Sequence, residues 1–490
     1  MSASRQLPEG WAWATLDEFT QGRGQSLDPS RHKAETFELY SIPGFDAGAP
    51  ELLNGSAIGS AKQMVNAGDV LLSKINPRIN RVWLVGEDRG FRQIASTEWI
   101  VFPRNDYING DYLKFFLRQH HVRNFLASNV SGVGGSLMRI KASTLDGYPI
   151  PVAPRDEQRR IVEKIEALFA ELDKGEESLR QVQKLLARYR QSVLKAAVTG
   201  ELTADWRARH AGNLEHGRDL LARILKARRE NWQGRGKYKE PVEPDTSSLP
   251  ELPEGWVWAT VGQIADVIGG LTKNSKRVSM PLRRPMLRVA NVYQNRLDLS
   301  DIHETGLTES ELERALLKPL DLLVVEGNGS KDQIGRMALW RGEIPGAVHQ
   351  NHLIKVRLIE KGMVEFLLWW FQSPDGRQMI EMVASSSSGL HTLSISKIES
   401  FAVPLPSLDE AQEITSQVRE ALLRIEQLNI YTEAELRRSA ALRRSILKDA
   451  FVGRLVPQDP TEEPATELIA RIRAQRSAEP HKSGRRKLTA

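Results

Sequence analysis

Two long segments of this chain resemble each other, and this internal repeat limits the possible folds more than any other feature of the sequence. Residues 7–16, LPEGWAWATL, recur at 252–261 as LPEGWVWATV. Residues 192–202, SVLKAAVTGEL, recur at 445–455 as SILKDAFVGRL. Each half therefore has a fixed opening, a variable middle and a fixed closing segment. The period far exceeds the roughly 50 residues of solenoid repeats, so the repeated unit is a whole domain.

The closing segments are predicted to be long helices. In residues 156–198, apolar residues return at alternating steps of four and three, with Gly175 filling the one missing place: Ile161, Ile165, Leu168, Leu172, Leu179, Val182, Leu186, Tyr189 and Val193. The second copy repeats the pattern with a polar interruption: Ile414, Val418, Ala421, Ile425, Leu428, then Thr432, Glu435 and Ser439, then Leu442 and Ile446. This spacing predicts a coiled coil. Two separate amphipathic helices in one globular core are the alternative.

The geometry of the chain favours an antiparallel pair. A helix over residues 156–198 would be about 65 Å long at 1.5 Å per residue. If the two helices ran parallel, the chain between them would have to return over that whole distance before the second domain begins. The roughly fifty residues before position 252 could manage either path, so this is a preference.

The variable middles show the pattern of mixed α/β domains. Strand-like runs lie at 69–75, 81–86 and 97–103 in the first half and at 321–327, 337–340 and 351–359 in the second. Each middle then has one predicted helix, at 111–126 or 364–380, followed by a loop of small residues, at 128–136 or 384–389. We therefore expect two α/β domains separated by two long helices that form an antiparallel coiled coil, related by a pseudo-two-fold repeat.

The predicted boundaries follow from this pattern. We expect a first domain at 1–150, a first long helix at 151–203, a short basic helix and linker at 204–251, a second domain at 252–403, a second long helix at 404–456 and a basic tail at 457–490.

Composition excludes several classes of function. The chain of 490 residues contains no cysteine, which rules out disulfides, thiolate metal sites and cysteine nucleophiles. No run approaches the roughly 18 apolar residues of a membrane span, and no secretory signal is recognisable, so we expect a cytoplasmic protein without a membrane partner. The net charge of +6 is modest, but residues 271–288 hold six basic residues and no acid. Local clusters of this kind are what contact with phosphates requires.

A search for catalytic motifs finds none. The glycine-rich segments 269–273 and 326–331 lack the spacing of a phosphate-binding loop. The sequence Asn76-Pro77-Arg78 lacks the second proline of an amino-methyltransferase motif, and His349 and His352 lie in a predicted strand, which disfavours a shared metal. We therefore expect a binding protein without a catalytic site, metal or cofactor of its own.

The repeated motifs resemble those of a known family. The two LPEGW openings, the match between YPIPVAPRDEQRRI at 148–161 and FAVPLPSLDEAQEI at 401–414, and the paired closings are similar to the specificity subunits of type I restriction-modification enzymes. The resemblance covers nearly the whole chain, although Ala411 replaces the glutamine found at Gln158.

The resemblance implies a function and a set of partners. Each domain would recognise one half of a split target on double-stranded DNA, and the helices would set the gap between the halves. Two modification subunits, which bind S-adenosylmethionine, would dock on the chain, and restriction or motor subunits using ATP and magnesium could join them. A stand-alone DNA-binding regulator and a coiled-coil scaffold that does not touch DNA are the alternatives.

The candidate DNA-contacting residues are basic or amide side chains of the variable middles, because arginine recognises guanine, asparagine recognises adenine and lysine mostly binds phosphate. They are Lys74, Asn76, Arg78, Arg81, Arg139, Lys141, Lys273, Lys276, Arg277, Arg283, Arg284, Arg288, Lys331, Arg336 and Asn351.

Overall fold

The chain is divided into two compact units that do not coincide with the two halves of the sequence. The computed structural model describes residues 6–20, 25–130, 138–232, 236–328, 333–384 and 391–478. Unit 1 comprises residues 1–180 and 433–490, and unit 2 comprises residues 181–432. Each unit thus contains one variable middle together with parts of both long helices.

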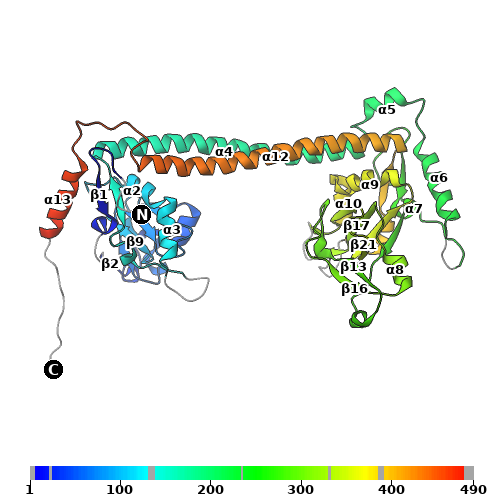
Figure 1. The fold of residues 1–490 in the computed structure, drawn as a ribbon, viewed down its shortest axis with the longest axis horizontal. Helices are drawn as coiled ribbons and strands as arrows, with labels where there is room; N and C mark the ends of the chain where they lie inside the picture. The colour runs from blue at the N-terminus through cyan, green and yellow to red at the C-terminus, as the bar shows by residue number, and fades with distance from the viewer. Residues whose placement is uncertain are drawn as a thin grey trace. The chain divides into compact units, whose positions relative to one another are not determined.

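Unit 1 is a mixed α/β domain with two main sheets. A five-stranded sheet has the order β2-β5-β8-β3-β4, a three-stranded sheet has the order β7-β6-β9, and β1 pairs with β10. The strands are β1 Ala12–Thr15, β2 Ser26–Leu27, β3 Thr36–Tyr40, β4 Glu51–Asn54, β5 Lys62–Met64, β6 Val70–Ser73, β7 Val82–Leu84, β8 Arg92–Ala95, β9 Trp99–Phe102 and β10 Pro149–Val152, and the short helices are α1 Ile42–Ala47, α2 Gly110–Leu117, α3 His120–Ser128 and α13 Ala465–Ala478 (Figure 1).

Unit 2 follows the same plan around a four-stranded sheet of order β12-β21-β17-β19 and a three-stranded sheet of order β16-β13-β20. Its strands are β11 Val257–Thr260, β12 Ala265–Gly269, β13 Arg283–Leu287, β14 Val292–Tyr293, β15 Arg296–Leu297, β16 His303–Gly306, β17 Asp321–Val325, β18 Gly327–Asn328, β19 Met337–Trp340, β20 Val348–His349, β21 Leu353–Leu358, β22 His391–Thr392 and β23 Ala402–Leu405. Its short helices are α5 Ala204–His210, α6 Gly217–Glu230, α7 Val261–Ile264, α8 Glu309–Ala315, α9 Val364–Gln372, α10 Pro374–Ala384 and α11 Ile395–Glu399.

The repeated opening segments have the same place in both units. β1 pairs antiparallel with β10 from Ala12↔Val152 to Thr15↔Pro149, and β11 pairs with β23 from Val257↔Leu405 to Thr260↔Ala402. The opening of each half therefore closes onto the strand that leads into the long helix, and the variable middle lies between these two strands.

A buried carboxylate fixes each opening to its long helix. In unit 1, Trp11 donates its indole N–H to Glu157 at 3.0 Å, and Gln458 donates to the other carboxylate oxygen at 3.2 Å. Burial raises the pKa of Glu157, and the bonds from Gln458 and Trp11 oppose this shift only in part.

The corresponding carboxylate in unit 2 has a cation beside it. Trp256 donates to Glu410 at 2.8 Å, and Thr203 and Arg207 donate to its other oxygen at 2.7 and 2.6 Å. The tryptophan of each LPEGW motif is thus a buried anchor for a glutamate in the first turn of a long helix.

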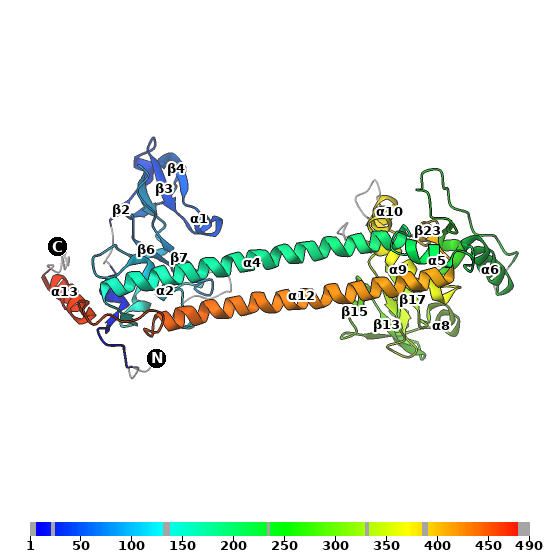
Figure 2. The same ribbon diagram turned by 90° about the horizontal axis from the view of Figure 1, so that it is seen from above.

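The long helices α4 Arg155–Val198 and α12 Leu408–Ala450 pack side by side and antiparallel, as predicted (Figures 1 and 2). Within unit 2, Gln183 donates to Thr432 at 3.2 Å. Within unit 1, Glu176 accepts from Ser439 at 2.7 Å and Arg443 donates to Asp173 at 2.7 Å. Residue numbers fall along α4 as they rise along α12, which defines the antiparallel direction.

The seam of the helix pair differs from the predicted one over residues 175–190 of α4 and at two positions of α12. The series Leu172, Leu179, Leu186 and Val193 is at least half-buried, as expected, but the intervening positions are Glu176, Gln183 and Arg190, each one residue beyond the predicted place. Val182, Tyr189, Leu428 and Leu442 were predicted in the seam and are exposed. In this stretch of α4, one of the two seam positions in each heptad was predicted correctly. The second seam position was missed because hydrogen-bonding and charged residues occupy it.

Each predicted middle helix is in fact two helices. The run at 111–126 breaks between α2 and α3 at Gln119, whose backbone is extended. The run at 364–380 breaks where Pro374 begins α10 and the Ser373 hydroxyl accepts the Gly376 N–H at 3.2 Å. A Cβ on Gly376 would lie 2.1 Å from the Trp370 carbonyl oxygen, so the close turn between α9 and α10 requires glycine. Apolar residues continue through both breaks, and for this reason each pair of helices was predicted as a single helix.

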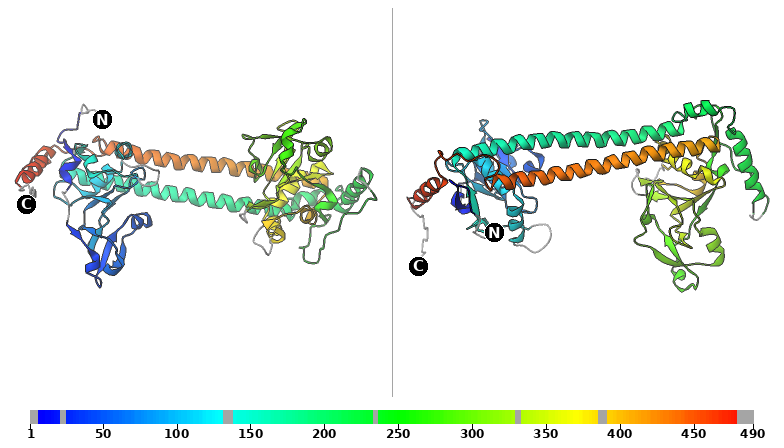
Figure 3. Two further views of the ribbon diagram at one scale, coloured as in Figure 1. Left: turned by 90° about the horizontal axis from the view of Figure 1, so that it is seen from below. Right: turned by 45° about the horizontal axis from the view of Figure 1, so that its top comes forward.

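The segment predicted as a basic tail contains helix α13, which packs onto unit 1. Leu468, Ile469 and Ile472 are buried, and the Ala465 N–H donates to the Gly10 carbonyl at 2.8 Å. Figure 3 shows α13 beside the N-terminal strands. In the part of the chain that the structure describes, no helix combines the length and apolar character needed to cross a lipid bilayer.

Candidate nucleic-acid interface

In unit 1, three predicted contact residues meet where strand β6 ends. The backbone N–H of Lys74 donates to the Glu98 carbonyl at 2.8 Å, and the Ile140 N–H donates to the Lys74 carbonyl at 3.0 Å. Ile75 also forms a bridge with Arg139. These bonds hold the loop after β6, the turn before β9 and the segment after the small-residue loop together, although they are distant in sequence.

Side chains at this point form a charged group. Arg139 pairs with Glu98 at 2.8 Å, and the Lys74 ammonium donates to the Thr97 carbonyl at 2.7 Å. Burial lowers the pKa of Lys74, and the nearby Glu98 carboxylate opposes that shift. Asn76 adopts a φ of 47° and donates its backbone N–H to the Met138 carbonyl at 2.9 Å, so it turns the loop. The fold thus brings together Lys74, Asn76 and Arg139, which the sequence prediction placed in two separate segments.

Unit 2 has the same backbone arrangement where strand β17 ends. The Glu326 N–H donates to the His352 carbonyl at 3.0 Å, and the Leu393 N–H donates to the Glu326 carbonyl at 2.7 Å. Strands β18 and β22 pair at Gly327↔Thr392. We call the three positions Lys74, Glu98 and Arg139 the unit 1 loop frame, and Glu326, His352 and Thr392 the unit 2 loop frame.

The core strands confirm that the two frames are equivalent. The sheet order β7-β6-β9 in unit 1 recurs as β19-β17-β21 in unit 2. The Ser73 N–H donates to the Arg81 carbonyl at 3.0 Å, and the Val325 N–H donates to the Arg336 carbonyl at 2.9 Å. The same ladder therefore precedes both frames.

A second exposed loop of unit 2 adjoins its frame. The Asn351 N–H donates to the Leu271 carbonyl at 2.9 Å, and Leu271 leads into an exposed segment that carries Lys273 and Lys276. Arg277 lies buried beneath these lysines, where it pairs with Glu311 at 2.8 Å and donates to the carbonyls of Thr272 and Gly306. This pairing is the main reason that the pKa of Glu311 is lowered to about 2.

The remaining candidates have varied environments. Arg78 and Lys141 are exposed. Arg283 pairs with Glu304 at 3.3 Å and Arg288 with Asp301 at 2.8 Å, while Arg284 donates to the Arg283 carbonyl at 2.8 Å. Lys331 lies outside the described residues.

Two further arginines among the candidates, Arg81 and Arg336, are also engaged inside the fold. Arg81 is buried and binds both carboxylate oxygens of Asp46 at 2.8 Å. Arg336 donates to the Val289 carbonyl at 3.0 Å and lies over the ring of Tyr293. A contact between DNA and Arg81, Arg277 or Arg336 would compete with these internal bonds.

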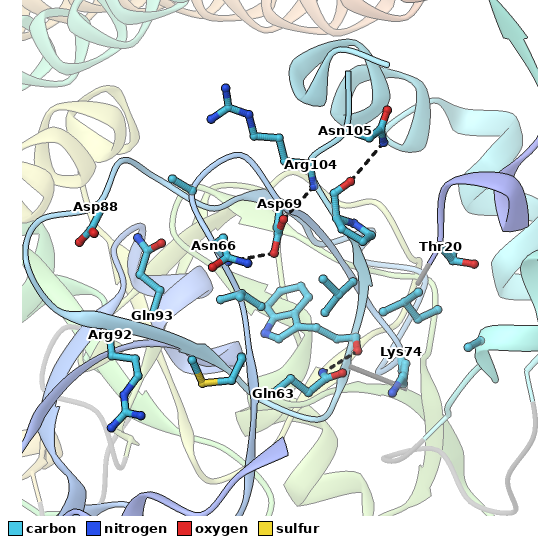
Figure 4. A pocket seen from close by; sticks show the side chains of 18 of the residues that line it. Thr20, Gln63, Asn66, Asp69, Lys74, Asp88, Arg92, Gln93, Arg104 and Asn105 are labelled. Atoms are coloured by element: carbon cyan, nitrogen blue, oxygen red, sulfur yellow. Dashed lines mark hydrogen bonds between the residues drawn. The ribbon is translucent and has the colours of Figure 1, made fainter. Parts of the chain in front are cut away.

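A hollow of about 1090 Å³ lies beside the unit 1 loop frame (Figure 4). Its polar groups bind neighbouring backbone: Asp69 accepts the N–H groups of Asn66 and Arg104 at 2.9 and 2.8 Å, and Gln63 donates to the carbonyls of Ser96 and Trp99. Burial raises the pKa of Asp69, and the two N–H bonds oppose that shift. These contacts fix the turns around the frame.

Curated relatives of this chain share one description. The specificity subunit of the type I restriction enzyme EcoKI from Escherichia coli strain K12 is 28% identical and aligns with 77% of this chain and 74% of its own length. The StySPI specificity subunit from Salmonella potsdam is 27% identical over 78% of this chain and 75% of its own. This chain is similar to type I specificity subunits over most of its length. No family model matches the chain.

Two solved structures share the fold of this chain. A chain from a structural study of complex assembly and conformational transition in a type I restriction-modification system superimposes with a TM-score of 0.63, at 19% identity, covering 92% of this chain and 100% of that chain. The HsdS subunit from Thermoanaerobacter tengcongensis gives a TM-score of 0.50 at 20% identity, covering 92% and 99%.

The sequence analysis missed the acidic members of the two frames, Glu98 and Glu326, because the search was restricted to basic and amide side chains. His352 was considered together with His349, and a shared metal was disfavoured because both lie in a predicted strand. A signal was present: the matching runs DVLLSK at 69–74 and DLLVVE at 321–326 both begin with an aspartate, Asp69 or Asp321. Aligning the two middles on these strands would have placed Lys74 opposite Glu326.

Proposed function

We propose that this chain selects a two-part DNA sequence for a type I restriction-modification complex, with unit 1 reading one part and unit 2 the other. The observation that carries the proposal is the duplicated loop frame, which has one backbone arrangement and two different sets of side chains. Two readers of one design but different chemistry are what an asymmetric, split target requires. The relatives named above support the same conclusion.

We propose further that modification subunits, two per chain, and restriction or motor subunits provide the chemistry. In this proposal S-adenosylmethionine, ATP and magnesium bind to those partners, and this chain contributes recognition and placement without a catalytic site of its own. Exposed apolar side chains on the helices within unit 2 support a protein partner there: Leu185, Tyr189, Leu423, Ile430 and Tyr431. Large apolar side chains exposed in a group commonly mark protein interfaces.

The test is an exchange of one reader. Residues 262–397 are replaced by the equivalent segment of another specificity subunit, which preserves the β11–β23 pair. The methylated motif in cells that carry the chimera and its modification subunit should change in one half only. If both halves change together, the two-reader proposal is wrong. If no motif is methylated by the parent system, while the chain still binds DNA in a salt-dependent way, the stand-alone regulator is favoured.

A further inference from the structure

The two loop frames place different chemical groups on one backbone scaffold. Position by position, Lys74 corresponds to Glu326, Glu98 to His352 and Arg139 to Thr392, as judged from matching backbone hydrogen bonds and strand registers. Unit 1 therefore presents two cations around one carboxylate. Unit 2 presents a carboxylate, an imidazole and a hydroxyl.

The hydrogen bonds that define each frame do not involve its side chains. In both units the two bonds that define the frame run between main-chain atoms, at 2.8 and 3.0 Å in unit 1 and at 3.0 and 2.7 Å in unit 2. Side chains at these positions can consequently differ without loss of the scaffold. This arrangement suits a recognition position, where the fold must stay constant while the specificity varies.

The side chains of the frames reach solvent while being held in orientation. Arg139 is 51% exposed and its guanidinium is paired with Glu98. His352 is 58% exposed, and its Nδ1 lies 2.9 Å from the Glu326 carboxylate, which is itself 30% exposed. An exposed ion pair stabilises a fold by only about 0–1 kcal/mol. Stability alone therefore does not account for such different charged groups at one place.

We infer that the loop frames contact base edges and determine which base each unit selects at this point of its half-target. Lysine and arginine donate to the two acceptors of guanine, whereas a glutamate accepts from an exocyclic amino group such as that of cytosine. Unit 1 accordingly selects a base with acceptors, namely guanine, through Arg139 and Lys74. Unit 2 selects a base with an amino group through Glu326. This inference rests on the proposed function.

The experiment uses the full chain with its modification subunit and a DNA pool in which both half-targets are randomised. The main variant is Glu326→Lys, which gives unit 2 the cation of unit 1. The control is Glu313→Lys, which makes the same charge change at an exposed position of α8. Glu326→Gln keeps the size of the side chain and removes its charge, and thermal unfolding establishes that each variant is folded.

The expected result is a change at one position of one half-target. Glu326→Lys should lose its preference for the amino-bearing base by about 5- to 150-fold and favour a base with acceptors, while the other half-target stays as in the wild type. Lys74→Glu should produce the reciprocal change in the other half only. Glu313→Lys should select the wild-type sequence. If Glu326→Lys binds no DNA, Glu326→Gln decides, with a fall in discrimination at that one position as the supporting result.

Two failures are distinguishable. If the wild-type complex selects no two-part sequence, the proposed function is wrong and the inference falls with it. If the wild-type complex selects a two-part sequence and the folded variants at positions 74 and 326 select the same one with the same discrimination, the proposed function stands and the inference is overturned.

Discussion

At the scale of single residues, the charged groups of this chain fall into those that hold the fold and those that face solvent, and the sequence does not separate them. Arg277 and Lys276 are neighbours in one basic run, yet Arg277 is buried against Glu311 while Lys276 is exposed. Arg81 likewise binds Asp46, which lies far away in sequence. Residue type and local charge were sufficient to locate the loops, but the acidic partners that bury particular arginines are set by tertiary structure.

The exposed lysines of unit 2 give a prediction about phosphate contact. Replacing Lys273 and Lys276 together by alanine should weaken binding to all DNA sequences and reduce the slope of log K against log salt by about 1.8, because each phosphate contact contributes about 0.9. Alanine at Lys226 and Lys361, also exposed in unit 2, should leave the slope unchanged. Titrations at several salt concentrations measure both. An unchanged slope for the first pair would place it away from the DNA.

The two buried glutamates give a second prediction, since they are alike in position and unlike in partners. Glu410→Gln should lower the free energy of unfolding of unit 2 by about 3 kcal/mol, because Arg207, whose side chain is 19% exposed, is left as a largely buried cation without its carboxylate. Glu157→Gln should cost unit 1 only about 1 kcal/mol, because its two donors are neutral and one hydrogen bond is weakened. Hydrogen exchange resolved by peptide, with urea as the denaturant, measures each unit separately. Equal losses would contradict this account.

The raised pKa of Glu157 predicts a pH dependence of unit 1 stability. Burial raises the pKa of Glu157, and its charged neighbours act in opposite directions, Arg160 lowering it and Glu462 raising it. A carboxyl group with a raised pKa in the folded state stabilises that state fully below its ordinary value near 4.5, and this contribution is lost as pH rises through the raised pKa. Glu157→Gln should therefore flatten the decline of unit 1 stability above about pH 4.5. If unit 1 stability depends on pH in the same way in the variant, ionisation of Glu157 does not lower the free energy of unfolding.

At the scale of elements, strands were easier to predict than helix boundaries. All six predicted core strands contain an observed strand, because short buried runs bounded by turn residues have few other ways to pack. The middle helices were predicted as single elements because apolar residues continue across Gln119 and Ser373. The breaks depend on an extended backbone and on a close contact at Gly376, which periodicity alone does not reveal.

The heptad pattern shows how a correct period can give an incorrect register. Apolar letters at Val182 and Tyr189 fit a step of three, but the chain uses the step of four and turns Gln183 and Arg190 inward. The choice is decided by partners on the other helix: Thr432 accepts from Gln183, and in unit 1 Arg443 binds Glu176. Polar residues in a seam cost stability and specify pairing, so their pattern is not visible as hydrophobic periodicity.

This register gives a third prediction. Replacing Gln183 by leucine together with Thr432 by valine should leave the free energy of unfolding of unit 2 unchanged or raise it by about 1 kcal/mol, because both members of a partly buried polar pair are replaced by apolar groups. Gln183→Leu alone should be less favourable, since it removes a hydrogen-bond partner of Thr432. Val182→Ser should change stability by less than about 0.5 kcal/mol, as expected for an exposed position. Urea unfolding compares the three. A larger loss of unfolding free energy for Val182→Ser would support the predicted seam, in which Val182 is buried.

At the scale of the whole molecule, the repeat and the two helices explain why one chain can serve as a two-part reader. The helices α4 and α12 each run from one unit into the other, since Arg180 lies within α4 and Thr432 within α12. The order of opening, middle and closing segments was evident from the sequence. That α13, from the end of the chain, completes unit 1 was not predicted, because its contact with Gly10 joins residues more than four hundred positions apart.

If the helix pair sets the gap between the half-targets, as the proposed function implies, its length should control that gap. Adding one heptad to α4 after Leu179 and one to α12 after Glu435 keeps the seam in phase, because the pairs Gln183–Thr432 and Glu176–Ser439 on either side of the insertions are both retained. Each insertion lengthens its helix by about 10 Å at 1.5 Å per residue. With DNA rising about 3.4 Å per base pair, the preferred gap should grow by about three base pairs. The half-targets should not change, because neither loop frame is altered. Activity should fall, since three base pairs also rotate one half-target around the duplex relative to the partner subunits.

Selection from a DNA pool with gaps of every length measures the effect. The control is an insertion of seven residues among 241–248, which lie outside any helix or strand, and this variant should keep the original gap. A folded variant with longer helices that still selects the original gap would show that another part of the complex measures the distance.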